Sequence, residues 1–185
     1  MTMVVRTPTG RPGLGEFADY AQADIDAVPG DDAVLALVSG AATVLAVLAP
    51  LNEAAVSGRS YAPGKWTLKE VLGHLADDER IFAYRALCVA RGDPRELPGF
   101  DENAYIASAG FEHRGWSDLL AEYQSVREAT LTLLGGLPPE AWLRRGTVNG
   151  YRASARGLAF HIAGHELHHL RVLRERYRIH RGAAL

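Results

Sequence analysis

The chain has 185 residues, of which 48% are hydrophobic and 23% charged. This composition is typical of one globular domain with a sizeable core, and it excludes a disordered or disulfide-stapled chain. Lysine and arginine (20) are balanced by aspartate and glutamate (22), for a formal net charge of -2. Because there is no basic surplus, we expect a small-molecule partner and no nucleic acid.

Cysteine content and hydropathy bear on the expected location of the protein. The single cysteine, Cys88, cannot form an internal disulfide, and the first residues lack the apolar core of a signal peptide. We therefore expect a cytoplasmic protein. Residues 33–51 carry no charge and almost reach the length of a bilayer span, but they contain Pro50 and lie between Asp32 and Glu53 rather than between basic residues. This stretch favours a buried helix, and we expect no membrane association.

The first half of the chain predicts one flexible segment followed by two long helices. Residues 1–14 are polar and rich in glycine, so we expect them to be flexible, whereas residues 15–180 should form a single domain. A short helical piece at 16–27 precedes the first long helix, which is expected at residues 32–55. The second long helix is expected at residues 67–90.

The second predicted helix has a well-marked start and is followed by a long connection. Thr67 can cap the helix, and Glu70 three positions later completes a capping box. Glycines and prolines at 92–99 then predict a loop that extends to about Arg114. A connection of roughly twenty irregular residues is typical of a lid or a binding loop.

The second half of the chain predicts two more long helices. One is expected from Ser117, as its N-cap, to about residue 134, and the other at residues 154–178. Between them, the prolines at 138–139 start a short helical turn, and Asn149 with Gly150 predicts a tight turn that can close a small hairpin. Four long helical patterns predict an all-α fold, an antiparallel four-helix bundle with short extra helical turns.

Four of the seven histidines lie within residues 161–169 of the last predicted helix. His165 to His169 spells HExxH, the string in which two histidines one turn apart bind zinc and the glutamate acts as a general base. At about 100° per residue, His165 and His169 fall on the apolar side of the helix, whereas His161 and His168 lie at its margin. The inward pair predicts part of a metal site, because tight sites usually take at least three protein ligands.

The second predicted helix offers the missing ligand. The same angular count places His74 and Asp78 at the border of its apolar face, one turn apart. His74 is the natural third ligand, and the alternative is an ordinary core or surface histidine. Asp78, Glu79 and Arg85 lie on or beside this face, where an unpaired charge would cost about 3 to 5 kcal/mol. They should pair or line a wet pocket, and an intrahelical pair of Asp78 with Arg85 fits equally well.

Two other metal motifs fit the sequence poorly. The longer zincin string needs glycine and histidine where this chain has Val172 and Glu175. Glu166 with His169 also spells the Glu-x-x-His of di-iron bundles, but the second copy of that motif is missing. A mononuclear site of three histidines remains, with its other coordination positions open to water or substrate. The alternative is that the histidines are merely packed in the core.

Several short motifs occur together in this chain, namely PGKWT at 63–67, GHLADDER at 73–80, LPGFDEN at 97–103 and GHELHHL at 164–170. Their combination resembles the DinB-like (YfiT-like) metal-binding bundles over about residues 20–177. The resemblance implies an antiparallel four-helix bundle that is often dimeric, with one divalent ion held by His74, His165 and His169. The most specific part is the GHL segment of one helix together with the H-x-x-x-H of the last.

The resemblance also implies a range of activities. Members of the family are described as metal-dependent hydrolases, and relatives include transferases and isomerases that use low-molecular-weight thiols such as bacillithiol or mycothiol. We therefore expect one divalent transition-metal ion, zinc or nickel before others, acting on a small-molecule substrate or thiol in a homodimer. The alternative is a non-catalytic, metal-stabilised module that acts in stress or binds a small molecule. Asp78, Arg85, Asp101 and His161 are the candidates for lining the pocket or supporting the ligands, and Glu166 is expected to stabilise the fold.

Overall fold

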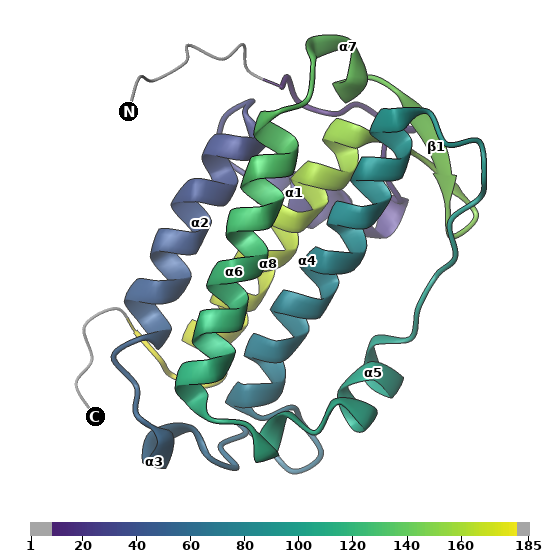
Figure 1. Cartoon of the computed structure of the whole chain (residues 1–185). Coiled ribbons are helices and arrows are strands. Elements are labelled where there is room, and N and C mark those ends of the chain that lie inside the picture. Colours follow the sequence, from purple (N-terminus) through teal and green to yellow (C-terminus); the bar gives the residue numbers. More distant parts are fainter. Residues whose placement is uncertain (1–8, 181–185) are drawn as a thin grey trace.

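Four long helices form the body of the molecule (Figure 1). The computed structural model describes residues 9–180. Its long helices are α2 (Ala33–Leu48), α4 (Leu68–Arg91), α6 (Trp116–Gly135) and α8 (Ala155–Glu175). Helix α4 packs against α6 and α8, and α2 packs against the same two helices, so the four surround one core. The predicted four-helix bundle is confirmed.

The helices run in two opposed pairs. Helices α2 and α8 run in one direction and α4 and α6 in the other (Figure 1). The reason is the connection between α4 and α6, which returns along the outside of the bundle before α6 begins. The contacting pairs α4 with α8 and α2 with α6 are therefore antiparallel.

The predicted first helix at residues 32–55 is broken in the structure. Helix α2 begins after Asp32, whose side chain accepts hydrogen bonds from Val34 N and Leu35 N, and it ends at Leu48. Pro50 has no backbone N–H to continue the helical hydrogen-bond ladder. The chain restarts as a separate short helix, α3 (Glu53–Val56), capped by Asn52. Before α2, the predicted piece at 16–27 is a turn η1 (Asp19–Ala21) followed by helix α1 (Gln22–Ala27).

Residues at the N-cap position mark where the other long helices begin. Both hydrogen bonds of the Thr67 and Glu70 capping box are present at the start of α4. Ser154 caps α8 by accepting from Gly157 N. The predicted cap of α6 was wrong, because the helix begins one residue earlier, at Trp116, and Gly115 takes the N-cap position without a side-chain bond.

The connection from residue 92 to 115 is more ordered than predicted. It contains helix α5 (Glu102–Ala109) and a turn η2 (Phe111–His113). Asp101 starts α5 by accepting hydrogen bonds from Asn103 N and Ala104 N. The expectation of a long irregular loop was therefore wrong, because this local cap stabilises a helix that has almost no amphipathic pattern.

A small hairpin holds the first part of that connection. After the short helix α7 (Pro139–Trp142), β1 (Arg145–Val148) pairs antiparallel with β2 (Tyr151–Ser154). The predicted turn is present, with Asn149 and Gly150 both at positive φ (48° and 80°). Leu97 N donates to Thr147 O (3.0 Å) and Asn149 N donates to Leu97 O (2.8 Å). The hairpin thus fixes the chain around residues 97–100 beside α4.

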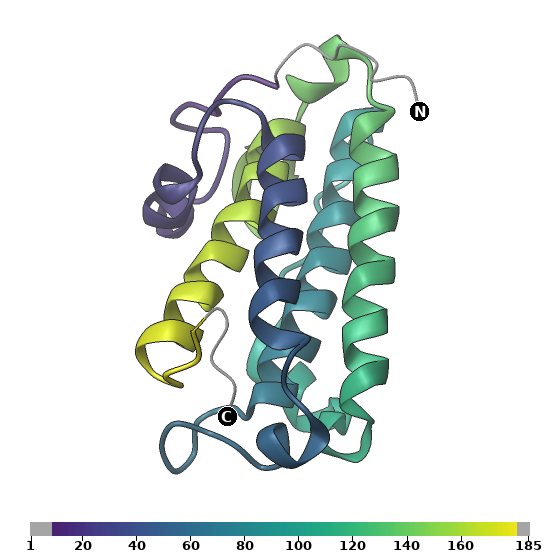
Figure 2. The ribbon, with the colours of Figure 1, turned by 90° about the vertical axis from the view of Figure 1, so that its left-hand side faces the viewer.

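The N-terminal segment is tied to the bundle from Thr9 onward. Residues 1–8 of the predicted flexible segment 1–14 lie outside the described residues. Thr9 is buried and accepts from Ala33 N (3.1 Å), and Arg11 donates to backbone carbonyls at both ends of the stretch from Ile25 to Gly30. Helix α1 lies along α8 (Figure 2), where Gly164 permits the approach of Asp24 O.

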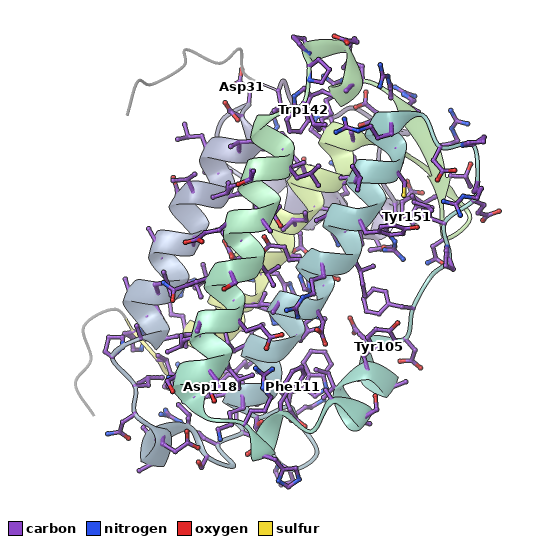
Figure 3. All side chains as sticks on the ribbon, in the orientation of Figure 1. Asp31, Tyr105, Phe111, Asp118, Trp142 and Tyr151 are labelled. Atoms are coloured by element: carbon purple, nitrogen blue, oxygen red, sulfur yellow. The ribbon has the colours of Figure 1, made fainter. Side chains whose placement is uncertain are left out.

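The core consists of two apolar clusters separated by a polar layer. One cluster contains Trp142 and the other Phe111, and Figure 3 shows these two side chains at opposite ends of the bundle. Between the clusters, α4, α6 and α8 contribute buried charged side chains, among them Glu79, Arg127 and Glu166. Within residues 9–180, no helix has both the length and the hydropathy needed to cross a membrane.

Candidate metal centre

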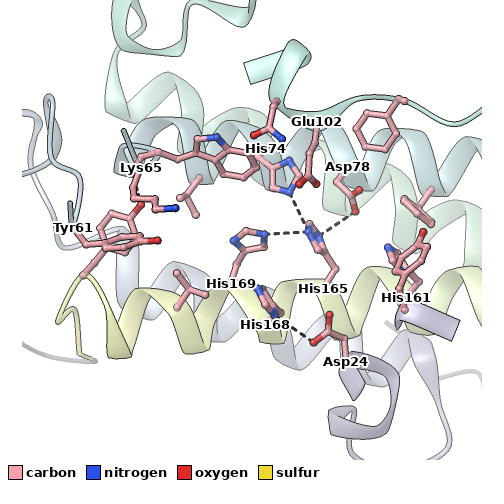
Figure 4. A pocket seen from close by; sticks show the side chains of 18 of the residues that line it. Asp24, Tyr61, Lys65, His74, Asp78, Glu102, His161, His165, His168 and His169 are labelled. Atoms are coloured by element: carbon pink, nitrogen blue, oxygen red, sulfur yellow. Dashed lines mark hydrogen bonds and ion pairs between the residues drawn. The ribbon is translucent and has the colours of Figure 1, made fainter. Parts of the chain in front are cut away.

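Three histidines from two helices meet in the middle of the bundle. His74 comes from α4, and His165 and His169 come from successive turns of α8. His165 Nε2 lies 3.0 Å from His74 Nε2 and 3.1 Å from His169 Nε2 (Figure 4). Within the described part of the chain, this is the one cluster of three or more histidine, cysteine or acidic side chains close enough to share a metal ion. The three side chains predicted from the helix faces are thus brought together.

The donor pattern of the three rings fits a shared cation. Asp78 Oδ2 lies 3.1 Å from His165 Nδ1. This contact favours the proton of His165 on Nδ1, which leaves a lone pair on the Nε2 that faces the other two rings. His74 and His169 also direct Nε2 to this point, and imidazole nitrogens at 2.0 to 2.1 Å are the usual zinc ligands. The residues present could therefore hold one metal ion.

The electrostatics keep two of the three histidines neutral. Burial, followed by the nearby charge of His165, lowers the pKa of His74 to about 4 and the pKa of His169 well below its ordinary value. For His165, burial lowers the pKa, but the Asp78 carboxylate outweighs it and raises the pKa overall. Burial raises the pKa of Asp78, but the neighbouring His165 outweighs burial and lowers the pKa overall. Neutral imidazole is the form that binds metal.

The histidines form part of the wall of a pocket of about 630 Å³. This volume is in the range of small-molecule sites. Lys65 and Tyr61 lie on one side of the histidines in Figure 4 and His161 on the other. Trp66 stacks 6.3 Å from the His169 ring and lies 4.7 Å from the His74 ring. The other aromatic residues of the wall are Tyr20, Phe82, Phe100 and Tyr177.

Three of the four residues predicted to line the pocket or support the ligands do line the pocket. Asp78, Arg85 and His161 all line the pocket. His161 stacks on Phe82 at 3.8 Å, and burial lowers the pKa of His161 to about 4. Asp101 is not among the lining residues, because its side chain caps α5.

The predicted alternative of an Asp78 pair with Arg85 is not formed. Asp78 contacts His165, and Arg85 donates to Pro98 O at 2.7 Å. Residues two turns apart on one helix are separated by about 10 Å in rise, so each side chain finds a partner on another segment.

Glu102 and Trp66 are two of the pocket residues that sequence reasoning missed. Glu102 enters the pocket from α5 and lies on the side of His74 and Asp78 (Figure 4). Helix α5 has almost no amphipathic pattern, so nothing in the local sequence indicated that Glu102 lines the pocket. Trp66 precedes the capping box of α4, and nothing in its local pattern indicated contact with the histidines.

Glu166, the glutamate of the HExxH string, belongs to the polar layer. It is 2% exposed and bonds Arg127 Nη2 at 2.6 Å, and Tyr123 Oη also donates to it. Arg127 in turn contacts Glu79 through Nε and Nη2 at 2.8 to 3.1 Å. The side chain is therefore engaged between α6 and α8, outside the histidine pocket, as expected of a residue that stabilises the fold.

Comparisons with known proteins agree with this architecture. The sequence model of the DinB superfamily matches residues 36–173. No match is found among curated proteins. YfiT from Bacillus subtilis, described as "a probable metal-dependent hydrolase with an unusual four-helix bundle topology", has a similar structure with a TM-score of 0.69. The match covers 91% of this chain and 93% of that chain at 17% identity, which establishes a shared fold.

Proposed function

The chain belongs to the DinB superfamily, and from this premise we propose that His74, His165 and His169 hold one divalent transition-metal ion, zinc or nickel, in a reactive site. The observation that carries the proposal is the meeting of three Nε2 atoms in the wall of a pocket of about 630 Å³. Structural zinc sites are closed by four protein ligands, whereas catalytic sites keep a position open. Three protein ligands beside a pocket match the second type.

The proposed chemistry is hydrolysis, or transfer of a low-molecular-weight thiol to a small electrophile. Three neutral imidazoles would leave a bound ion its full charge, and such an ion would supply the positive charge that lowers the pKa of a water or thiol. The description of YfiT as a probable metal-dependent hydrolase supports the hydrolytic branch. The open pocket accommodates either substrate class.

The residues around the histidines have separate proposed roles. Asp78 holds His165 in the tautomer that directs Nε2 toward the other ligands. Glu102 reaches the same space from α5 and accepts a proton from the nucleophile. Trp66 packs over His74 and His169 and keeps water from that side of the site.

Turnover by metal-free and reloaded protein tests the proposal. Protein stripped by a chelator and reloaded with zinc or nickel is assayed on a panel of esters, amides and thiol-conjugation substrates. We expect activity only after reloading, and loss of activity in His74→Ala with a folded bundle. His113→Ala is the control, because His113 is exposed on η2 and does not line the pocket. A metal-loaded protein inactive on the whole panel would contradict the reactive role.

The alternative, a metal-stabilised module without catalysis, predicts a different result from the same variant. His74→Ala would then lower the melting temperature strongly while no activity is present to lose. The homodimer implied by the family resemblance stays a prediction, which sedimentation velocity can test.

A further inference from the structure

Arg85 is a buried cation inside the pocket. It lies on α4, eleven residues after His74, and is 3% exposed. Its guanidinium lies over the rings of Phe82 (4.6 Å) and Phe100 (5.6 Å), and Nη2 donates to Pro98 O at 2.7 Å. The two aromatic rings pack against the guanidinium, and its N–H edge is the part that can bind a ligand.

The buried charge of Arg85 has no counter-ion. Among residues 9–180, no carboxylate oxygen lies within 4.0 Å of its guanidinium nitrogens, whereas buried Arg127 contacts two carboxylates and buried Lys69 contacts Glu53. Asp78 and Glu79, the acidic residues of α4 that line the core, are engaged with His165 and Arg127. Only one of the five N–H donors of Arg85 has a hydrogen bond to the protein.

A buried, unpaired guanidinium is costly unless something compensates it. We propose that Arg85 binds a carboxylate group of the substrate at the end of the pocket opposite Lys65. This inference rests on the proposed function only in placing the reacting end of the same molecule at the histidines. The substrate class is then a small molecule with a carboxylate at one end, an apolar body and the reacting group at the other.

The surroundings of Arg85 select a carboxylate over other anions. The planar fork of a guanidinium matches the two oxygens of a carboxylate. A phosphate dianion would call for more positive charge, but the same pocket carries the acidic side chains of Asp24 and Glu102. Phe82 stacks on His161 beside Arg85, and these rings supply an apolar wall for the body of the ligand.

The separation along α4 places His74 and Arg85 in different parts of the pocket. Eleven residues of helix separate the Cα atoms of His74 and Arg85 by about 16 Å. A ligand that reaches both ends of the site therefore needs several bonds between its carboxylate and its reacting group. Acetate or formate is too short to do so.

Calorimetric titration of an acid and its neutral analogue tests the inference. The probes are 4-phenylbutyrate and 4-phenylbutyramide, titrated into chelator-treated protein so that a metal ion cannot bind the carboxylate. We expect the acid to bind at least about tenfold more tightly than the amide, as for a charge-assisted pair. Arg85→Met should abolish this preference, and Arg85→Lys should retain part of it because the charge remains without the fork.

Arg80→Met is the matched control, since Arg80 lies on the same helix but outside this pocket and pairs with Glu122. It should leave the preference unchanged. Should Arg85→Met fail to fold, Arg85→Lys carries the comparison. Equal affinities of acid and amide in the unaltered protein, no binding of the acid, or a full preference in both Arg85 variants would overturn the inference. Because these titrations use metal-free protein, their failure leaves the test of metal-dependent turnover untouched, and failure of that turnover leaves these titrations valid.

Discussion

At the level of single residues, Asp78 determines how His165 takes part in the site. Its carboxylate lies 3.1 Å from His165 Nδ1, while His165 Nε2 faces both other histidines. A carboxylate in this position fixes the ring and makes the opposite nitrogen a stronger ligand. The candidate site therefore consists of three possible ligands and one orienting residue, all on α4 and α8.

Removing the charge of Asp78 should weaken the site without unfolding the protein. We expect Asp78→Asn to lower metal affinity by about 10- to 100-fold, because the amide holds the imidazole less firmly and no longer favours one tautomer. Competition with a chromogenic chelator measures the affinity. The control is Asp77→Asn, which alters a neighbouring carboxylate that pairs with Arg80. Equal affinities of Asp78→Asn and the unaltered protein would show that the contact has no role in binding.

The sequence predicted the three candidate metal ligands better than it predicted the residues that surround them in the pocket. His74, His165 and His169 follow from helical periodicity, because a residue's direction on a helix depends only on its position. Asp101 and Glu102 show the limit of this reasoning. Asp101 caps α5 and Glu102 enters the pocket, and the sequence could not distinguish these roles because α5 has almost no amphipathic pattern. The partner of Glu79 is Arg127, on a different helix, so no local pattern could indicate it.

At the level of elements, the close approach of α2 and α8 depends on a glycine. A Cβ atom on Gly40 would lie 1.8 Å from Glu166 Oε1. Glu166 cannot move aside freely, because Arg127 and Tyr123 both hold it. Gly40 therefore provides the space for the polar layer between the two apolar clusters.

Alanine at position 40 should destabilise the protein, although alanine is normally the better helix former. We expect Gly40→Ala to lower the free energy of unfolding by about 1 to 3 kcal/mol through overpacking. Gly135→Ala is the control, since no atom lies within 4 Å of its added Cβ, and it should be neutral or stabilising by up to about 1 kcal/mol. Urea denaturation measures the free energy of unfolding of both variants. If Gly40→Ala has the same free energy of unfolding as Gly135→Ala, Gly40 is not needed to make space for Glu166.

A second link between elements depends on pH. Glu16 is buried and accepts hydrogen bonds from Arg156 (2.6 and 2.7 Å), Ser154 (2.9 Å) and Arg145 (3.0 Å), joining the N-terminal segment to the hairpin and α8. The bonds from Arg156 lower the pKa of Glu16 below 4.5 more than burial raises it. The ionised side chain thus stabilises the fold fully above pH 4.5, and this contribution is lost as the pH falls through the lower pKa of the folded state.

Glu16→Gln should therefore destabilise the protein in a pH-dependent way. At pH 7 we expect a loss of about 1.5 to 3 kcal/mol, the range for hydrogen bonds to a charged group. Below pH 4.5 the difference from the unaltered protein should shrink. Urea unfolding at steps from pH 7 to pH 3 measures it, with Glu175→Gln as an exposed control. A difference that stays constant over this range would contradict the role of the ionised carboxylate.

Local chemistry explains which elements were predictable. The Thr67 and Glu70 capping box marks the start of α4 because both of its bonds form within four residues. The end of α2 was misplaced, since an apolar pattern continues past Pro50 although the helix stops at Leu48. Helix α5 was missed because its stability comes from a cap and from its contact with α4 rather than from periodicity.

At the level of the whole molecule, the candidate site joins two antiparallel helices at the middle of the bundle. His74 comes from the second long helix, and His165 and His169 come from the last, some ninety residues later in the chain. The pocket at this point takes wall residues from both apolar clusters, Phe82 from one and Val71 from the other. Because α4 packs against α8 in this bundle, the fold brings His74 next to His165 and His169. Neither helix could form the site alone.

Metal content is the most direct test of the central claim that these three histidines hold one ion. Protein purified without added metal and without a histidine-rich tag is analysed by mass spectrometry, together with His74→Ala, His165→Ala and His169→Ala. We expect about one transition-metal ion per chain in the unaltered protein, as for a mononuclear site, and its loss in each variant. An ion content that is the same in all four proteins would contradict the account.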